Sequence, residues 1–187
     1  MIPAAFDYAA PATVREAVGL LRGRAGDARP LAGGQSLIPM MRLRLVNPAL
    51  VVDLARIRDL AYVREHDGGL AIGAMTTYRA IETSTLVRER FPLLAEVAGQ
   101  VADLQVRNRG TIGGALAHAD PSADLPALMV AAEARIATAG GRRARSIAAS
   151  RFFVDAFTTA LGETEIITEV RLPAHLRTAG GARVGGA

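Results

Sequence analysis

A chain of 187 residues, half of them hydrophobic, is long enough for one domain with a sizeable core or for two small lobes that share a ligand. It contains no cysteine, which excludes disulfides, thiolate nucleophiles and any iron–sulfur cluster held by this chain alone. All 22 basic residues are arginine, so lysine chemistry is excluded. The net charge of +4 is spread along a chain with few aromatic residues, which argues against nucleic-acid binding.

Hydrophobic runs in this sequence are short. The stretch at residues 127–132 is far below the roughly 20 residues of a membrane-spanning helix, so we expect no membrane span. The N-terminus has no basic segment that leads into an apolar one, which is the pattern of a secretory signal. We therefore expect a cytoplasmic protein.

Helix and strand patterns alternate in the first part of the chain. Thr13 and Glu16 form a capping-box pattern at the start of an amphipathic helix. Next come an apolar strand pattern, a helix entered at Ser36 with Pro39 in its first turn, and a second strand pattern. These segments are residues 28–33, 36–45 and 49–54. Their order predicts a small β-α-β lobe over residues 1–57.

A second lobe is predicted over residues 58–173, where short strands and helices mix. A hairpin is expected at Asp67-Gly68-Gly69, and another around Gly140-Gly141. Helices are expected at 77–84, 91–103, 124–134 and 150–161, a glycine-rich loop at 110–114 and a last strand at 165–173. Residues 174–187 lack an apolar period and are expected to form a tail.

Two glycine pairs stand out, one in each predicted lobe. Gly33-Gly34 lies at a strand-to-helix junction, and Gly113-Gly114 follows Thr111. Such pairs indicate unusual torsions or a close approach to the backbone that no side chain permits. Successive N–H groups in a tight turn before a helix bind anions, so a pyrophosphate shared by both loops fits this pattern.

Each loop is weak evidence by itself. A single glycine pair is often an ordinary turn, and neither loop matches the glycine patterns of Rossmann or P-loop sites. From the residues alone the chain is an α+β domain with a nucleotide as its expected ligand.

Other polar side chains allow a functional interpretation beside a structural one. His118 and Asp120 fit a base and its orienting carboxylate, although a spacing of two is no dyad signature and turn residues are favoured. Arg107 and Arg109 fit phosphate neutralisation, exposed loop positions or a subunit contact. Asp53 fits a ribose ligand or, as the favoured interpretation, a cap at a strand end.

A family resemblance rests on five segments in this order: residues 29–45, 51–57, 72–77, 107–114 and 119–129. Over residues 1–173 the chain resembles the FAD-binding medium subunits of molybdenum hydroxylases, the family of xanthine dehydrogenase and aerobic carbon monoxide dehydrogenase. Within that family it looks most like the carbon monoxide dehydrogenase flavoproteins. The resemblance implies an α+β, two-lobed FAD-binding domain of the vanillyl-alcohol oxidase/PCMH type, with FAD between the lobes.

The resemblance also implies which residues hold the cofactor. The loop around the pyrophosphate would be Ala32, Gly33, Gly34, Gln35 and Ser36. The second FAD loop would be Thr111, Ile112, Gly113, Gly114 and Ala115. Asp124 would accept a hydrogen bond on the ribose or adenine side, Ile167 would pack against the flavin, and Val101 has a weaker claim to the same role.

The chain departs from the family pattern at two places. The family usually carries Asn or Ser where this chain has Ala115, which removes one side-chain hydrogen bond, worth on the order of 1 kcal/mol. The family also continues past the position of Pro173 into a further domain, so this chain resembles a short version of it.

The function implied by the resemblance is electron transfer within a complex. A large molybdenum-cofactor subunit would oxidise the substrate, a small subunit with two 2Fe–2S clusters would carry the electrons, and this flavoprotein would pass them on. The expected assembly is a dimer of heterotrimers, with noncovalent FAD, because no cysteine is present for a thioether. A self-sufficient flavin reductase of the same fold and a scaffold that has lost FAD remain alternatives.

Overall fold

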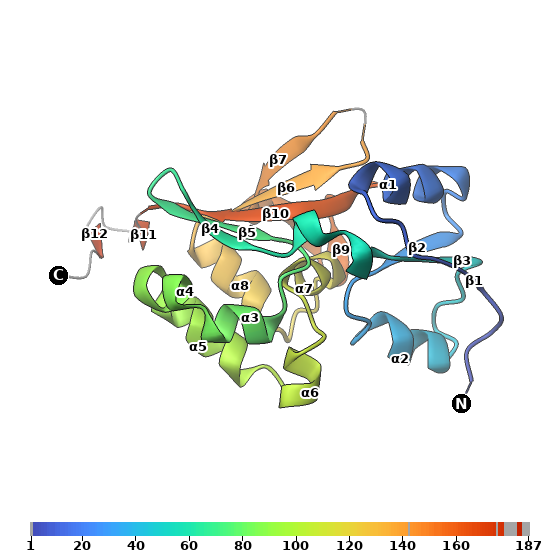
Figure 1. Cartoon of the computed structure of the whole chain (residues 1–187), viewed down its shortest axis with the longest axis horizontal. Coiled ribbons are helices and arrows are strands. Elements are labelled where there is room, and N and C mark those ends of the chain that lie inside the picture. Colours follow the sequence, from blue (N-terminus) through green and yellow to red (C-terminus); the bar gives the residue numbers. More distant parts are fainter. Residues whose placement is uncertain (1, 142, 175, 178–182, 185–187) are drawn as a thin grey trace.

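The computed structural model describes residues 2–174, 176, 177, 183 and 184, with residue 142 left out. A small parallel sheet lies at its N-terminal end, with strand order β1-β3-β2 (Figure 1). β2 (Ala28–Leu31) and β3 (Leu50–Asp53) are joined through α2 (Leu37–Arg42), which confirms the predicted β-α-β unit. β1 (Asp7–Ala9) pairs with the other side of β3 and was not predicted.

Helix α1 (Val14–Gly23) packs on this small sheet through one apolar face. Thr13 caps it by accepting a hydrogen bond from the N–H of Glu16 at 3.2 Å, and the Glu16 carboxylate accepts from the N–H of Ala12 at 3.0 Å. This is the reciprocal pattern of a capping box, as the sequence predicts. Its buried face adjoins a core that also contains Leu60 and Ile166.

A five-stranded antiparallel sheet forms the larger part of the fold, in the order β4-β5-β10-β6-β7. Its strands are β4 (Val63–His66), β5 (Gly69–Gly73), β6 (Arg135–Ala139), β7 (Arg145–Ala148) and β10 (Ile166–Leu172). Both predicted hairpins are present. In the first, Asp67 and Gly68 adopt φ of +49° and +77°, as a two-residue turn requires.

Helices cover one face of this sheet (Figure 1). They are α3 (Tyr78–Thr83), α4 (Thr85–Arg90), α5 (Pro92–Gln100), α6 (Leu104–Arg107), α7 (Ile112–His118), α8 (Asp124–Ala131) and α9 (Ala149–Phe152). The main core lies between this layer and the sheet, where Ile72 and Val170 meet side chains such as Leu116 and Met129. Short 3-10 turns, Leu54–Arg56 and Arg58–Leu60, connect the two sheets.

Three sequence expectations are wrong in detail. The glycine-rich segment at 110–114 is only partly a loop, because helix α7 begins at Ile112. The predicted helix at 150–161 ends after Phe152 and is followed by β8 (Phe153–Asp155) and β9 (Thr158–Thr159). The expected tail contains a pair of two-residue strands, β11 (Leu176–Arg177) and β12 (Arg183–Val184).

The boundary between the predicted lobes, 1–57 and 58–173, stays a prediction. The two sheets lie on either side of it, but Leu60 and Ile166 belong to the same core cluster as the N-terminal strands. In the part of the chain that the structure describes, every helix is too short or too polar to cross a membrane.

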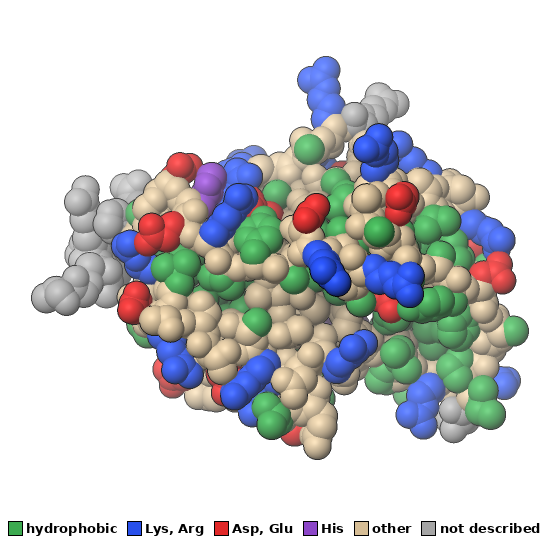
Figure 2. Space-filling view, viewed as in Figure 1, with side chains coloured by type: hydrophobic (Ala, Val, Ile, Leu, Met, Phe, Trp, Pro, Cys, Tyr) green, Lys and Arg blue, Asp and Glu red, His purple; other side chains and the backbone are tan. Residues whose placement is uncertain are grey.

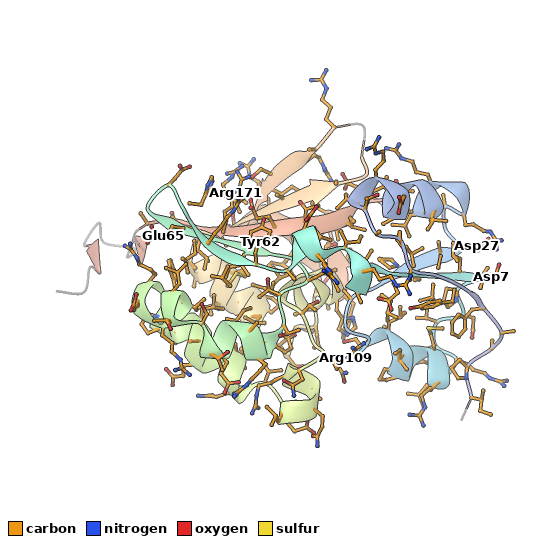
Figure 3. All side chains as sticks on the ribbon, viewed as in Figure 1. Asp7, Asp27, Tyr62, Glu65, Arg109 and Arg171 are labelled. Carbon is orange, nitrogen blue, oxygen red and sulfur yellow. The ribbon has the colours of Figure 1, made fainter. Side chains whose placement is uncertain are left out.

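The face of the large sheet that the helices leave open carries a buried charge. Glu169 on β10 is 5% exposed and accepts hydrogen bonds from Tyr62 at 2.5 Å, from Arg64 at 2.9 Å and from Arg171. Tyr62 and Arg171 lie on the same side of the sheet (Figure 3). Burial alone raises the pKa of Glu169, but these three donors outweigh it and lower the pKa to about 2.

The lowered pKa of Glu169 predicts an acid-dependent loss of stability. The carboxylate contributes stability above its ordinary pKa of 4.5, and this contribution declines as the pH falls from about 4.5 toward 2. We expect Glu169→Gln to lower the free energy of unfolding at pH 6 and the difference from the parent protein to narrow by pH 3. Urea unfolding at pH 6, 4 and 3 measures this, with Glu65→Gln, in an exposed ion pair with Arg90, as the control. A difference that stays constant with pH would contradict it.

Candidate functional site

The two glycine loops contact each other directly. Gly33 and Gly34 adopt φ of +84° and +81°, which L side chains rarely adopt. A Cβ on Gly33 would lie 2.1 Å from the carbonyl oxygen of Arg109, and a Cβ on Gly114 would lie 2.8 Å from that of Ala32. The close approach to the backbone that the sequence predicts is present at Gly33 and Gly114, and at these two positions the approaching group is the backbone of the opposite loop.

Thr111 links the loops through its hydroxyl group. The hydroxyl accepts from the N–H of Gly114 at 3.1 Å, which caps α7, and donates to the carbonyl of Ala32 at 3.4 Å. The N–H of Ile112 donates to Thr76 and that of Gly113 to Ala74, at 3.1 and 2.8 Å. Most N–H groups at the start of α7 thus have protein acceptors, so this loop chiefly supports the other.

The first loop has the unpaired donors. Five consecutive N–H groups, those of residues 33–37, have no hydrogen-bond acceptor among the described residues. The Ser36 hydroxyl makes no capping bond, although Ser36 precedes α2. Gly34 is buried, so its N–H group has limited access to water. A run of unpaired N–H groups at the start of a helix is suited to an anion such as a phosphate.

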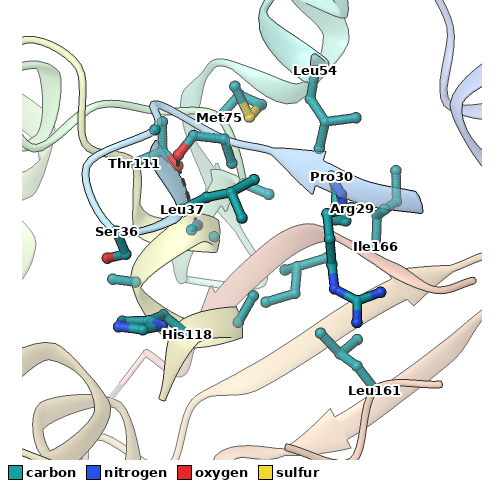
Figure 4. Close-up of a pocket in the computed structure, with 18 of the residues that line it drawn as sticks. Arg29, Pro30, Ser36, Leu37, Leu54, Met75, Thr111, His118, Leu161 and Ile166 are labelled. Atoms are coloured by element: carbon teal, nitrogen blue, oxygen red, sulfur yellow. Dashed lines mark hydrogen bonds between the residues drawn. The ribbon is translucent and has the colours of Figure 1, made fainter. Parts of the chain in front are cut away.

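A cavity of about 420 Å³ lies between the loops and the end of the large sheet (Figure 4). Its size is in the range of small-molecule and cofactor sites. Nine of the predicted cofactor residues line it: Ala32, Gly34, Gln35, Ser36, Thr111, Gly113, Gly114, Ala115 and Ile167. The structure therefore brings both loops and β10 to one site.

Four predicted residues do not line this cavity. Gly33 lines a neighbouring cleft instead, and Ile112 is fully buried at the start of α7. Asp124 is exposed at the first position of α8, and Val101 packs against the main core at the end of α5. The roles expected of Asp124 and Val101 stay predictions without support from the cavity.

Several lining residues were missed by the sequence interpretation. Met75, Tyr78, Leu54, Leu161 and Ile166 contribute apolar surface, and burial raises the pKa of Tyr78 to about 12. These residues are far apart in the sequence and have no motif of their own. The sequence shows that these residues are apolar, but only the folded structure shows that they line the same wall of the cavity.

Polar side chains reach the far end of the cavity. Arg29 points toward Leu161 there (Figure 4), and its guanidinium donates to the carbonyls of Gly26 and Ala28 at 3.0 Å. Glu165 is 7% exposed and is held by Arg145 and by the N–H of Gly162 at 2.8 Å. This carboxylate is committed to protein partners and fixes the shape of the cavity wall.

The residues with a possible catalytic role have structural partners. Asp120 accepts from the N–H and hydroxyl of Ser122, and these hydrogen bonds lower its pKa, which confirms a turn residue. His118 ends α7, lines the cavity and lies against the Phe157 ring, 5.2 Å between centroids. Asp53 accepts from the N–H of Ala55 at 2.9 Å, which confirms the strand-end cap.

Arg107 is also structural. It donates to the carbonyls of Val101 and Ala102 at 3.2 and 3.1 Å, and its Nε lies 3.4 Å from the Glu82 carboxylate. Arg109 is exposed, and its carbonyl faces Gly33. The phosphate role therefore stays open only for Arg109, whose side chain makes no hydrogen bond or ion pair with another described residue.

A loop with unpaired N–H groups, an apolar wall and an α+β fold with two main sheets are suited to a dinucleotide. Residues 4–175 match the family described as "FAD binding domain in molybdopterin dehydrogenase". The chain belongs to this family.

Known proteins are similar over nearly the whole chain. The carbon monoxide dehydrogenase medium chain of Hydrogenophaga pseudoflava is 46% identical over 97% of this chain and 63% of its own length. The glyceraldehyde dehydrogenase medium chain of Sulfolobus acidocaldarius is 39% identical over 92% of this chain and 61% of its own. The chain therefore spans about three fifths of the length of these relatives.

A solved structure agrees with the fold. The carbon monoxide dehydrogenase of Hydrogenophaga pseudoflava that lacks the Mo-pyranopterin moiety matches with a TM-score of 0.91 and 47% identity, over 96% of this chain and 62% of that one. The predicted α+β fold of a family FAD-binding domain is thereby confirmed.

Proposed function

We propose that the chain is the FAD-binding part of the medium subunit of a cytoplasmic molybdenum hydroxylase, similar to that of carbon monoxide dehydrogenase. The observation that carries the proposal is the run of five unpaired N–H groups at residues 33–37, beside a cavity of about 420 Å³. A dinucleotide supplies the pyrophosphate oxygens that such donors need. Family membership over residues 4–175 identifies FAD as the matching dinucleotide.

The residues present fit this cofactor. The unpaired N–H groups of Gly34 to Leu37, which line the cavity, would hold the pyrophosphate, and the Ser36 hydroxyl is a further donor beside them. The apolar wall of Leu54, Met75 and Ile167 would pack against a flat ring and exclude water from it. Bound FAD supplies the redox chemistry, since it exchanges electrons either singly or in pairs.

The protein residues bind, orient and exclude water, and no side chain needs to act as acid or base. His118 and Tyr78 border the cavity, and the side chain of neither makes a hydrogen bond with another described residue. The sequence contains no cysteine for a thioether link, and noncovalent FAD is part of the proposal.

Partners are part of the proposal. The subunit would receive electrons from a small subunit with two 2Fe–2S clusters and pass them to an external acceptor, while a large molybdenum subunit oxidises the substrate. A dimer of heterotrimers is the expected assembly. The names of two relatives contain carbon monoxide and glyceraldehyde, and the proposal assigns the choice of substrate to the molybdenum subunit.

Two alternatives remain from the sequence: a stand-alone flavin reductase and a scaffold that has lost FAD through changes such as Ala115. The unpaired donors of the first loop do not involve the Ala115 side chain, which favours retention of FAD. The scaffold alternative therefore has less support than the electron-transfer subunit.

We expect purified protein to contain FAD. FMN has a single phosphate, which can pair with only some of these donors, whereas the pyrophosphate of FAD can pair with more of them, so FAD is expected to exceed FMN at least tenfold. An absorbance spectrum followed by chromatography of the flavin released on denaturation measures this. Protein that stays colourless after incubation with excess FAD would support the scaffold instead, and FMN as the sole flavin would exclude the assigned pyrophosphate loop.

A further inference from the structure

One arginine of β2 faces the cofactor cavity. Arg29 is the only arginine among the described residues that line it. Pro30, Ala32 and residues 34–37 line it too, so β2 and the first loop run along one wall. Five residues of extended chain span about 16 Å. Arg29 and Ser36 accordingly lie on opposite sides of the cavity (Figure 4), and Arg29 is remote from the unpaired N–H groups.

Backbone carbonyls hold the guanidinium of Arg29 in place. Its Nη1 donates to the carbonyls of Gly26 and Ala28, both at 3.0 Å. Its Nε and Nη2 make no hydrogen bond with another described residue, and the group points toward Leu161 (Figure 4). A guanidinium stays protonated in proteins. Arg29 therefore presents a fixed positive charge and free donors to a ligand at this end of the cavity.

The charge of Arg29 has no ion-pair partner among the described residues. The carboxylates that line the described part of the cavity are Glu163 and Glu165. Glu165 is held by Arg145, and Glu163 is exposed, so water weakens its field. Other arginines on the face shown in Figure 2 are dispersed, with carboxylates between many of them. The positive charge inside the cavity is left for a ligand.

Apolar side chains surround this end of the cavity. Leu54, Leu161 and Ile166 lie on the same side of it as Arg29 (Figure 4). The opposite end is more polar, with Ser36 and His118. Of the two rings of FAD the isoalloxazine is the larger, so it is suited to the more extensive apolar wall. With the pyrophosphate on the first loop, the flavin ring would lie beside Arg29.

The isoalloxazine ring changes its charge when it is reduced. The oxidised ring is neutral, whereas the fully reduced ring loses the proton of N1 near neutral pH and becomes an anion. A cation beside the ring binds the anion more tightly than the neutral ring, and charge near N1 tunes the electronics of a bound flavin. The phosphates carry the same charge in both states, so a cation beside them would not distinguish the two.

We propose that Arg29 lies against the pyrimidine edge of the flavin and sets its midpoint potential by favouring reduced over oxidised FAD. This inference rests on the proposed function, since it takes the cavity as the FAD site. It adds the direction in which FAD lies in the cavity and a residue that determines how readily the bound flavin accepts electrons.

The test compares the two oxidation states of bound FAD. The midpoint potential of bound FAD relative to free FAD gives the dissociation constant of oxidised FAD divided by that of reduced FAD. Spectroelectrochemical titration at pH 7.5 measures it. We expect Arg29→Met to lower this ratio at least tenfold, which is about 30 mV for a two-electron couple. Arg29→Lys keeps the charge and should stay within threefold of the parent.

Two controls separate this role from others. Arg151→Met removes an exposed arginine of α9 outside the cavity and should leave the ratio unchanged. ADP has the pyrophosphate and adenosine of FAD but no flavin. Displacement of FAD by ADP should therefore give equal ADP affinities for Arg29→Met and the parent.

Three results would overturn the role of Arg29. They are an unchanged ratio in Arg29→Met, a ratio in Arg29→Lys as low as that in Arg29→Met, and equal weakening of both oxidation states together with weaker ADP binding. The last result would make Arg29 a phosphate ligand. A parent protein that binds no FAD would contradict the proposed function, whereas a parent that binds FAD and shows any of these three results contradicts this inference alone.

Discussion

Replacing Gly33 by alanine will abolish FAD binding and lower the melting temperature. The new Cβ would lie 2.1 Å from the backbone carbonyl of Arg109, which cannot rotate away as a side chain would. The φ of +84° adds a strain of about 1 kcal/mol for a residue with a Cβ. The loops must therefore separate, which displaces the unpaired N–H groups from the cavity. We expect at least a hundredfold weaker binding in a titration of the apo-protein with FAD.

Gly19→Ala is the matched control for Gly33→Ala. Gly19 lies in the middle of α1, and an added Cβ there meets nothing within 4 Å. Alanine at this position should raise the free energy of unfolding by about 0.5–1 kcal/mol and leave FAD affinity unchanged. If Gly33→Ala binds FAD like the parent, the contact between the loops has no part in forming the site.

Replacing Arg145 by methionine will cost about 3 kcal/mol of stability. Arg145 holds the Glu165 carboxylate through two hydrogen bonds and also donates to the carbonyl of Ala160 at 2.8 Å. The Glu165 side chain is only 4% exposed, so loss of the guanidinium leaves a buried charge with the N–H of Gly162 as its remaining donor. Methionine keeps much of the apolar stem, which isolates the effect of the charge.

Arg90→Met provides the comparison for Arg145→Met. Arg90 pairs with Glu65 at the surface, where the two side chains are 49% and 58% exposed, so its removal should cost less than about 1 kcal/mol. Urea unfolding at pH 7 gives both values. Equal losses in the two variants would mean that the Glu165 carboxylate is better solvated than its burial indicates.

Elements that are encoded within a few consecutive residues could be predicted from the sequence. The capping box at Thr13, the turn at Asp67-Gly68 and the apolar run of β10 are each encoded within a few residues, and each is present. β1 has three residues, of which two are exposed, and it depends on pairing with β3 more than forty residues later. No local pattern indicates such a strand.

Helix α7 was missed because glycine disfavours helices. Gly113 and Gly114 stand in its first turn, and their weak propensity is compensated by the Thr111 cap and by the packing of Ile112 and Leu116 in the core. A Cβ on Gly113 would lie 2.6 Å from that of Ala74, so the glycine is set by a tertiary contact. That contact is invisible until the chain is folded.

The sequence named the residues of the two loops but not the contacts that hold these loops in place. The family resemblance named both loops and Ile167, and the structure brings them to one cavity. The unusual torsions and the close approach predicted for the glycines are present, but the sequence could not show that the approaching group at Gly33 and Gly114 is the opposite loop. The apolar wall of Met75, Tyr78 and Leu161 depends on the topology, which no residue pattern specifies.

Amide hydrogen exchange of the protein with and without FAD tests the central claim most directly. The N–H groups of residues 33–37 should exchange rapidly in the apo-protein and slowly once FAD is bound. Those of Gly113 and Gly114, which already have protein acceptors, should be slow in both states. Riboflavin, which has no phosphate, should leave residues 33–37 unprotected. Exchange at residues 33–37 that is unchanged by stoichiometric FAD would contradict the account.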